Sequence, residues 1–196
     1  MNYINIREFI RFVIKEDAER LDSAQILSQY AHRGQKRRSG EPYFLHPQEV
    51  ANIVTRYYND DRTYYTALLH DAIEDGIPIG NIEDKETFFE LLMSEIPGED
   101  IKIADSVYNS VLALTKTGEQ EYSTYIEGLT GNVYALRVKL ADMMQNISDN
   151  PSNKQMLKYV KAKDLLLQKF GNNPPAGISN QHWQDFQDEI EKAKTA

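Results

Sequence analysis

The chain has 196 residues, 41% of them hydrophobic, with a formal net charge of −8 at pH 7 and no cysteine. The absence of cysteine excludes disulfides and thiolate metal ligands, and the acidic balance disfavours nucleic acid as a partner. No segment approaches the run of about 20 apolar residues that spans a membrane, and the first residues lack the pattern of a secretion signal. We therefore expect a cytoplasmic protein with a sizeable core and with neither a membrane nor a nucleic acid as partner.

Apolar residues recur with the helical period along most of the chain, and no alternating strand pattern is convincing. This pattern predicts an all-α fold, a compact bundle of many helices. The expected helices cover residues 4–15, 19–33, 47–58, 61–75, 85–95, 99–115, 120–129, 131–148 and 153–170. The stretch 34–45 is rich in Gly, Ser, Pro and charge and is predicted as a loop. Pro47 then opens the next helix, because a missing N–H costs little in the first turn.

A stretch rich in Gly, Asn and Pro divides the chain into a predicted domain, residues 1–170, and a tail, residues 171–196, made of this linker and a final helix. In the final helix, Trp183, Phe186 and Ile190 form a thin apolar stripe. Because such a stripe buries itself against another element, the helix docks either on the body of the protein or on a second subunit. A homo-oligomer is one of these two alternatives.

One short segment carries an imidazole and three carboxylates beside an apolar run: His70, Asp71, Glu74 and Asp75. At 3.6 residues per turn, His70, Asp71 and Glu74 share one side of the predicted helix. Carboxylates this close repel one another unless a positive charge lies among them, and a divalent metal is the obvious candidate. The segment therefore predicts a hydrolytic metal site.

A second acid stands in an apolar setting. In the helix predicted over 131–148, Asp142 shares a ridge with Val138 and Asn146, and a second ridge is apolar. A helix that is apolar on two sides is expected to be central, so Asp142 should be buried. A buried carboxylate is usually paired or bound to a metal, and a salt bridge to a neighbouring helix is as consistent with the spacing as a metal.

The histidines are His32, His46, His70 and His182. His182 lies beyond the linker and is expected at the surface, while His32 ends a helix, where a cation is favoured. Taken singly, each histidine fits a structural role better than a catalytic one. Together, however, His46, His70, Asp71 and Asp142 form a plausible set of ligands for one metal such as Mn, Fe, Zn or Mg.

A basic segment interrupts the acidic chain. Its four positive charges within six residues are Arg33, Lys36, Arg37 and Arg38. Such a patch indicates a small anionic ligand, although a solvated loop is the simpler explanation for a charge run taken alone.

Three segments carry a resemblance to a known family. The segment 31–47 resembles the opening motif of the HD-domain alarmone hydrolases of the RelA/SpoT type. The segment 66–75 resembles their HD…ED motif, and 138–142, followed by Asn146, resembles their closing Lys-Leu-Ala-Asp motif. The three motifs occur in the family's order and span about residues 25–150.

The resemblance implies an all-helical HD fold that holds a single Mn²⁺, or another divalent metal. The implied ligands are His46, His70, Asp71 and Asp142, and the implied catalytic acids are Glu74 and Asp75. The implied substrate-binding residues are Lys36, Arg37, Arg38, Ser39, Tyr43 and Asn146, with Arg37 against the guanine base. The implied reaction is hydrolysis of guanosine 3′-diphosphate 5′-di- or triphosphate to pyrophosphate and GDP or GTP. The closest analogy is to the small members that only hydrolyse.

The chain departs from the family pattern at two places. The closing motif reads Asp142-Met-Met-Gln-Asn146 where the family usually has Asp-Arg-Leu-His-Asn, and Gly76 stands where a threonine is common. Two alternatives therefore stay open. One is an HD-superfamily phosphatase or phosphodiesterase for another nucleotide, and the other is an alarmone-binding protein without catalysis.

Overall fold

The structure is a computed structural model that describes residues 23–95 and 101–195. These residues form helices and no strand, and an isolated antiparallel bridge joins Lys36 to Pro42. The helices are α2 (Ser23–Ala31), α3 (Leu45–Val54), α4 (Asp61–Leu69), α5 (Ala72–Gly76), α6 (Lys85–Glu95), α7 (Ile101–Leu114), α8 (Tyr122–Leu129), α9 (Val133–Ser148), α10 (Asn153–Phe170) and α11 (Asn180–Thr195). The all-α prediction is confirmed. The helix predicted over 4–15, and the start of the one predicted over 19–33, lie outside the described residues.

Polar side chains define the starts of several helices. Asp60 accepts a hydrogen bond from the Thr63 amide at 3.0 Å at the start of α4. Asn132 caps α9 in the same way, and Ser152 begins α10 with a reciprocal capping box. The helix predicted over 47–58 begins at Leu45 and already ends at Val54.

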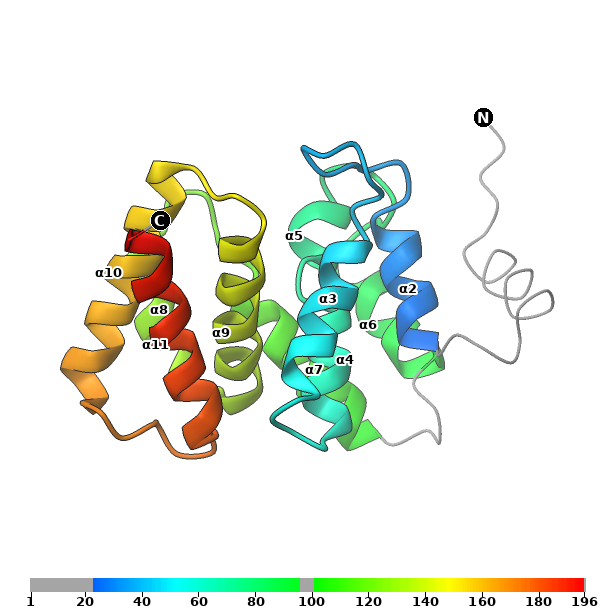
Figure 1. Ribbon diagram of the computed structural model, residues 1–196. Helices are drawn as coiled ribbons and strands as arrows, with labels where there is room; N and C mark the ends of the chain where they lie inside the picture. The colour runs from blue at the N-terminus through cyan, green and yellow to red at the C-terminus, as the bar shows by residue number, and fades with distance from the viewer. Residues whose placement is uncertain (1–22, 96–100, 196) are drawn as a thin grey trace.

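Helix α9 is the centre of the bundle. It contacts α3, α4 and α7 on one side and α8 and α11 on the other, and Figure 1 shows it between these two groups. Its buried side chains include Leu136, Val138, Leu140 and Asp142. The two apolar ridges read from the sequence therefore correspond to the two packed sides of α9, and Asp142 is buried as predicted.

The C-terminal helix docks on the body of the same chain. Trp183, Phe186 and Ile190 are buried, and α11 contacts α9 and α10. Of the two alternatives for this apolar stripe, the structure shows the first. The division into a domain ending at residue 170 and a separate tail stays a prediction.

The prediction that His182 lies at the surface was wrong. Its imidazole is fully buried, stacks on the Tyr57 ring with centroids 4.3 Å apart, and pairs with the Tyr58 hydroxyl at 2.9 Å. The cause is the docking of α11, which carries this polar residue inward beside its apolar stripe.

This burial predicts acid sensitivity. Burial lowers the pKa of His182 from 6.5 to about 3, so the folded protein requires the neutral imidazole. Below pH 6.5 the unfolded chain takes up a proton that the folded chain cannot, so stability is lost as the pH falls toward 3. We expect this group to lower the free energy of unfolding by about 2 kcal/mol between pH 7 and pH 5. The slope approaches about 1.4 kcal/mol per pH unit where His182 is protonated in the unfolded chain and neutral in the folded one.

His182→Phe keeps an aromatic ring for the stack but cannot titrate. Urea unfolding of both proteins at the two pH values isolates the contribution of His182, because every other group is common to both. We expect the variant to lose less stability than the parent on acidification. An equal loss in the two proteins would contradict the assignment.

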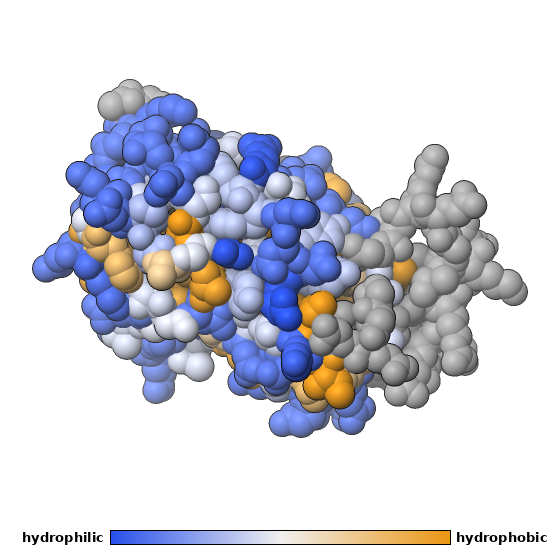
Figure 2. All heavy atoms as spheres, turned by 90° about the horizontal axis from the view of Figure 1, so that it is seen from below, coloured by the Kyte–Doolittle hydropathy of each residue, from blue (hydrophilic) through white to orange (hydrophobic). Residues whose placement is uncertain are grey.

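Among the described helices, none combines the length and apolar character that a membrane crossing requires. The face shown in Figure 2 is largely hydrophilic, with apolar atoms in small separate groups. The large apolar side chains that are most exposed in the described residues, Ile79, Ile101 and Leu157, come from different parts of the chain.

Candidate metal centre

The sequence predicted one helix for the segment that carries His70 and Asp71, and this was wrong. The segment forms two helices joined by a turn. Helix α4 ends at Leu69 and α5 begins at Ala72. The Nδ1 atom of His70 pairs with the carbonyl oxygen of Ala67 at 2.8 Å, the oxygen that an uninterrupted α-helix would pair with the Asp71 amide. Neighbouring side chains on a helix do not face each other. In the turn they do, and His70 Nε2 lies 3.2 Å from Asp71 Oδ2.

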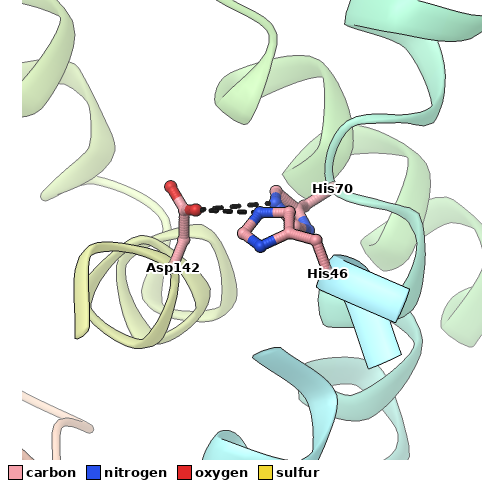
Figure 3. Close-up of side chains that lie close together, drawn as sticks. All are labelled: His46, His70 and Asp142. Atoms are coloured by element: carbon pink, nitrogen blue, oxygen red, sulfur yellow. Dashed lines mark ion pairs between the residues drawn. The ribbon is translucent and has the colours of Figure 1, made fainter. Parts of the chain in front are cut away.

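Three helical regions bring the predicted ligands together. One ligand atom from each of His46, His70 and Asp142 lies within 4.8 Å of the others. Asp142 Oδ1 is 3.2 Å from His46 Nε2 and 3.9 Å from His70 Nε2, as the dashed lines in Figure 3 show. Asp71 Oδ2 adds a fourth group, 3.7 Å from His46 Nε2. The predicted set therefore shares one site.

The hydrogen bonds of the two imidazoles leave the correct atoms free. His46 Nδ1 pairs with Gln145 Oε1 at 2.7 Å, and His70 Nδ1 with a backbone oxygen. Each ring therefore donates a proton from Nδ1, and its Nε2 atom faces the carboxylates and is the atom that a metal would take. His70 Nε2 is buried and has no hydrogen-bond partner. Two imidazole nitrogens and two carboxylate oxygens that face one another in this way fit a divalent cation between them.

Asp142 combines the two settings that the sequence presented as alternatives. Its Oδ2 accepts a hydrogen bond from Lys139 Nζ at 2.7 Å, while its Oδ1 faces the imidazoles and accepts from Asn146. Arg137, on the same helix, pairs with Asp60. Although burial disfavours the charged form, Lys139 and the histidines lower the pKa of Asp142 below its usual range.

His70 and Asp71 shift each other's pKa in the centre. Burial opposes a charge on His70, but Asp71 and Asp142 outweigh it and raise the pKa of the imidazole to about 9. Burial likewise opposes the charge on Asp71, yet His70 and His46 hold the pKa of this carboxyl well below its usual range. Both shifts have the same origin, the attraction between the protonated imidazole and the ionised carboxylates.

The two predicted catalytic acids, Glu74 and Asp75, have different hydrogen-bond partners. Glu74 lines a depression together with the ligands of the centre, and its Oε2 accepts a hydrogen bond from the Lys116 amide at 2.9 Å. Burial raises the pKa of Glu74, more than the bond to Lys116 lowers it, and the charge of Asp71 adds to the rise. Asp75 accepts a hydrogen bond from Gln35 at 2.9 Å.

Two depressions flank the centre, and Asn146 lines both. The first has a volume of about 220 Å³ and the second about 250 Å³. The first, here called the acid depression, is lined by His70, Asp71, Asp142 and Glu74, by Lys116, Lys139 and Lys158, and by three tyrosines. The second, here called the basic depression, is lined by His46 and Tyr43 and by Lys36, Arg37 and Arg38. The predicted ligands thus lie between two depressions that are lined by lysine and arginine side chains.

Most of the predicted substrate-binding residues reach the basic depression, and Ser39 does not. Ser39 is exposed, and its hydroxyl donates to Glu41 at 3.1 Å. Tyr43 donates its hydroxyl proton to Asp71 at 2.8 Å, which ties the basic loop to the centre. His32 is buried beside this loop, with its ring 4.8 Å from that of Tyr43, rather than at an exposed helix end.

Sequence reasoning did not single out Lys116, Lys139 or Gln145. Lys139 was visible inside the closing motif, three residues before Asp142, which is the spacing of neighbours on a helix. Lys116 follows α7 in a loop, and Gln145 is separated from His46 by 99 positions. No local pattern marks such long-range partners.

Three residues at which the chain departs from the family pattern, Met143, Met144 and Gly76, are closely packed. Met143 is fully buried and Met144 nearly so, within the core cluster. A Cβ atom at Gly76 would lie 3.1 Å from Ile82 Cδ1 and 3.3 Å from the carbonyl oxygen of Ala31. A larger residue at this position would therefore press against the end of α2.

A model of the HD domain matches residues 24–163. The chain belongs to the HD-domain family. Its relatives include a GTP pyrophosphokinase of Myxococcus xanthus, 31% identical over 67% of this chain and 17% of the relative. They also include the GTP pyrophosphokinase rsh of Brucella melitensis, 34% identical over 65% of this chain and 16% of the relative.

A third relative is the bifunctional (p)ppGpp synthase/hydrolase SpoT of Escherichia coli K12, 29% identical over 73% of this chain and 20% of the relative. The resemblance to the HD domain of RelA/SpoT proteins, which the motifs indicated, is thus confirmed. The HD chain spans a fifth or less of the length of these relatives.

Proposed function

We propose that this HD domain is a metal-dependent phosphohydrolase that removes pyrophosphate from the 3′ position of guanosine 3′,5′-bis(diphosphate) or its triphosphate analogue. The observation that carries the proposal is the convergence of two histidines and two aspartates between two cation-lined depressions. Similarity to a protein named as a (p)ppGpp synthase/hydrolase supports the substrate class. A cytoplasmic location and Mn²⁺ as the native metal are parts of this proposal.

His46, His70, Asp71 and Asp142 would hold the metal through the Nε2 atoms and the carboxylate oxygens described above. A divalent cation supplies Lewis-acid polarisation of a phosphate and lowers the pKa of water toward neutrality. The chain contributes the geometry. Each imidazole is held by a hydrogen bond at Nδ1, and Asp142 by Lys139 and Asn146, so these ligands need little rearrangement to bind.

Glu74 is the group we assign to accept a proton from the attacking water. Its carboxylate lines the acid depression with His70 and Asp71, and burial raises its pKa. A carboxylate with a raised pKa is a stronger base near neutral pH. Asp75 is held by Gln35, and we assign it a supporting role in orienting water or substrate.

The lysines of the acid depression suit a pyrophosphate group. Lys116, Lys139 and Lys158 line the same 220 Å³ space as Glu74. Lys139 is held to Asp142, and its pKa is raised well above the usual value because Asp142 and neighbouring tyrosines outweigh the effect of burial. It therefore remains charged at any pH at which the protein works, and it can stabilise negative charge on a departing phosphate.

Arg37 suits contact with the base rather than with a phosphate. The edge of its guanidinium is taken by Asp149 at 2.5 Å, by Glu49 at 3.4 Å and by Gln145 at 3.3 Å. With these donors engaged, the flat face of the guanidinium is the part that can still bind, and arginine stacks well on planar rings. Lys36 and Arg38 line the same depression and can neutralise the remaining phosphates.

The test is product identification. The protein is incubated with Mn²⁺ and a panel of guanosine and adenosine polyphosphates, and the products are separated by ion-exchange chromatography. Pyrophosphate and GDP from guanosine 3′,5′-bis(diphosphate) are the expected products. Orthophosphate would instead indicate a phosphatase of the same superfamily, and ligand-induced stabilisation without any product would indicate a binding protein.

A further inference from the structure

The buried side chain of Gln145 lies between the metal centre and the basic loop. It follows Asp142 by three positions on α9, so both residues face the same side of the helix. Its Oε1 accepts hydrogen bonds from His46 Nδ1 at 2.7 Å and from Arg37 Nη2 at 3.3 Å. Its Nε2 donates to Glu49 Oε2. Every polar atom of this amide therefore has a protein partner.

These partners fix the orientation of the amide. A reversed amide would set its NH₂ group against the N–H groups of Arg37 and its oxygen against the carboxylate of Glu49. Both contacts would be repulsive, so Oε1 must face His46. An oxygen can only accept a hydrogen bond, so the proton of the His46 ring lies on Nδ1. Nε2 is then the ring atom that faces Asp142, 3.2 Å away, and the atom that a cation would take.

The two histidines of the centre are oriented by different means. For His70, the acceptor is a backbone carbonyl in the turn between α4 and α5, which no substitution of a side chain removes directly. For His46, the acceptor is a side chain from another helix. The tautomer of His46 therefore depends on the identity of residue 145, and that of His70 does not.

We propose that Gln145 is a positioning residue of the metal centre that holds His46 in the Nδ1–H tautomer and so keeps its Nε2 available to the cation. The proposal rests on the metal site of the proposed function and not on its nucleotide. Arg37 and Glu49 act through Gln145 by fixing its amide. Loss of such a partner of a metal-binding histidine typically weakens metal affinity by about 10–100-fold.

Substitution of Gln145 gives the first test. Gln145→Met keeps the length of the side chain and removes the strong acceptor, and we expect Mn²⁺ affinity measured by calorimetry to fall about 10–100-fold. The double variant Gln145→Glu with Glu49→Gln restores an acceptor for His46 and a donor–acceptor pair at position 49, and we expect affinity within about threefold of the parent, below the range that loss of the partner produces. Gln48→Met is the control, because Gln48 lies on α3 near His46 but pairs with Gln25. Equal affinity in the methionine variant and the parent would overturn the proposal, as would a double variant as weak as the methionine variant.

The second test needs no variant. In metal-free protein labelled with ¹⁵N-histidine, the nitrogen shifts of neutral His46 report directly which ring nitrogen carries the proton. The Nδ1–H form is expected, and the Nε2–H form would overturn the proposal even if the substituted proteins failed to fold. Neither test measures turnover. A protein that passes both tests but releases no pyrophosphate would refute the proposed substrate and leave the role of Gln145 intact.

Discussion

Asp71→Ala is expected to abolish both metal retention and turnover. The other acid of the centre, Asp142, is already paired with Lys139, so Asp71 supplies the charge that is left to balance a cation. Its carboxylate is also the group that the turn after α4 directs at the imidazoles. Loss of metal activation removes several kcal/mol of transition-state stabilisation, which corresponds to a fall in turnover of about 10³-fold or more.

The measurement combines metal content after gel filtration with the rate of product release. Asp164→Ala is the matched control, because Asp164 is an exposed aspartate on α10, away from the centre. The control is expected to behave as the parent does. Retention of one Mn²⁺ per chain by the Asp71 variant would contradict the assignment, and so would full activity of the parent protein after chelation.

Glu74→Gln is expected to lower kcat by about 10²–10⁴-fold, the range for loss of a general base, without loss of the metal. The glutamine keeps an oxygen that can accept from the Lys116 amide, so the local structure should persist. Because the pKa of Glu74 is raised above 4.5 by burial, activity of the parent should fall as the pH drops through that raised value. The variant should lack this acidic limb.

Steady-state kinetics over a range of pH, together with Mn²⁺ binding, test this prediction. Asp75→Asn is the companion variant, and a smaller loss is expected because Gln35 holds that carboxylate. A Glu74 variant that turns over as fast as the parent, or that loses its metal, would show that Glu74 is not the base.

The fold was predictable where burial follows a periodic pattern. The two apolar ridges of α9 identified the central helix, because this signal is local. The break after Leu69 was not predictable in this way. It arises from the pairing of the His70 ring with a backbone oxygen, which leaves the apolar periodicity of the segment unchanged.

The burial of His182 escaped prediction for a related reason. A polar residue beside a linker resembles a surface residue, and only the docking of α11 on α9 and α10 brings it against Tyr57. The four residues predicted as metal ligands were grouped by three sequence motifs, and their side chains converge in the structure. Their role as ligands stays a prediction. Gln145, the partner of His46, and Lys116, the partner of Glu74, are distant from them in the chain, and these pairings became visible only in the structure.

The central claim is that His46, His70, Asp71 and Asp142 hold a single divalent cation. Electron paramagnetic resonance of the protein titrated with Mn²⁺, with electron spin echo measurements to detect bound nitrogen, tests it most directly. One tightly bound Mn²⁺ per chain is predicted, with couplings to two imidazole nitrogens of which one disappears in His46→Ala. A stoichiometry other than one, or nitrogen couplings unchanged in that variant, would contradict the account.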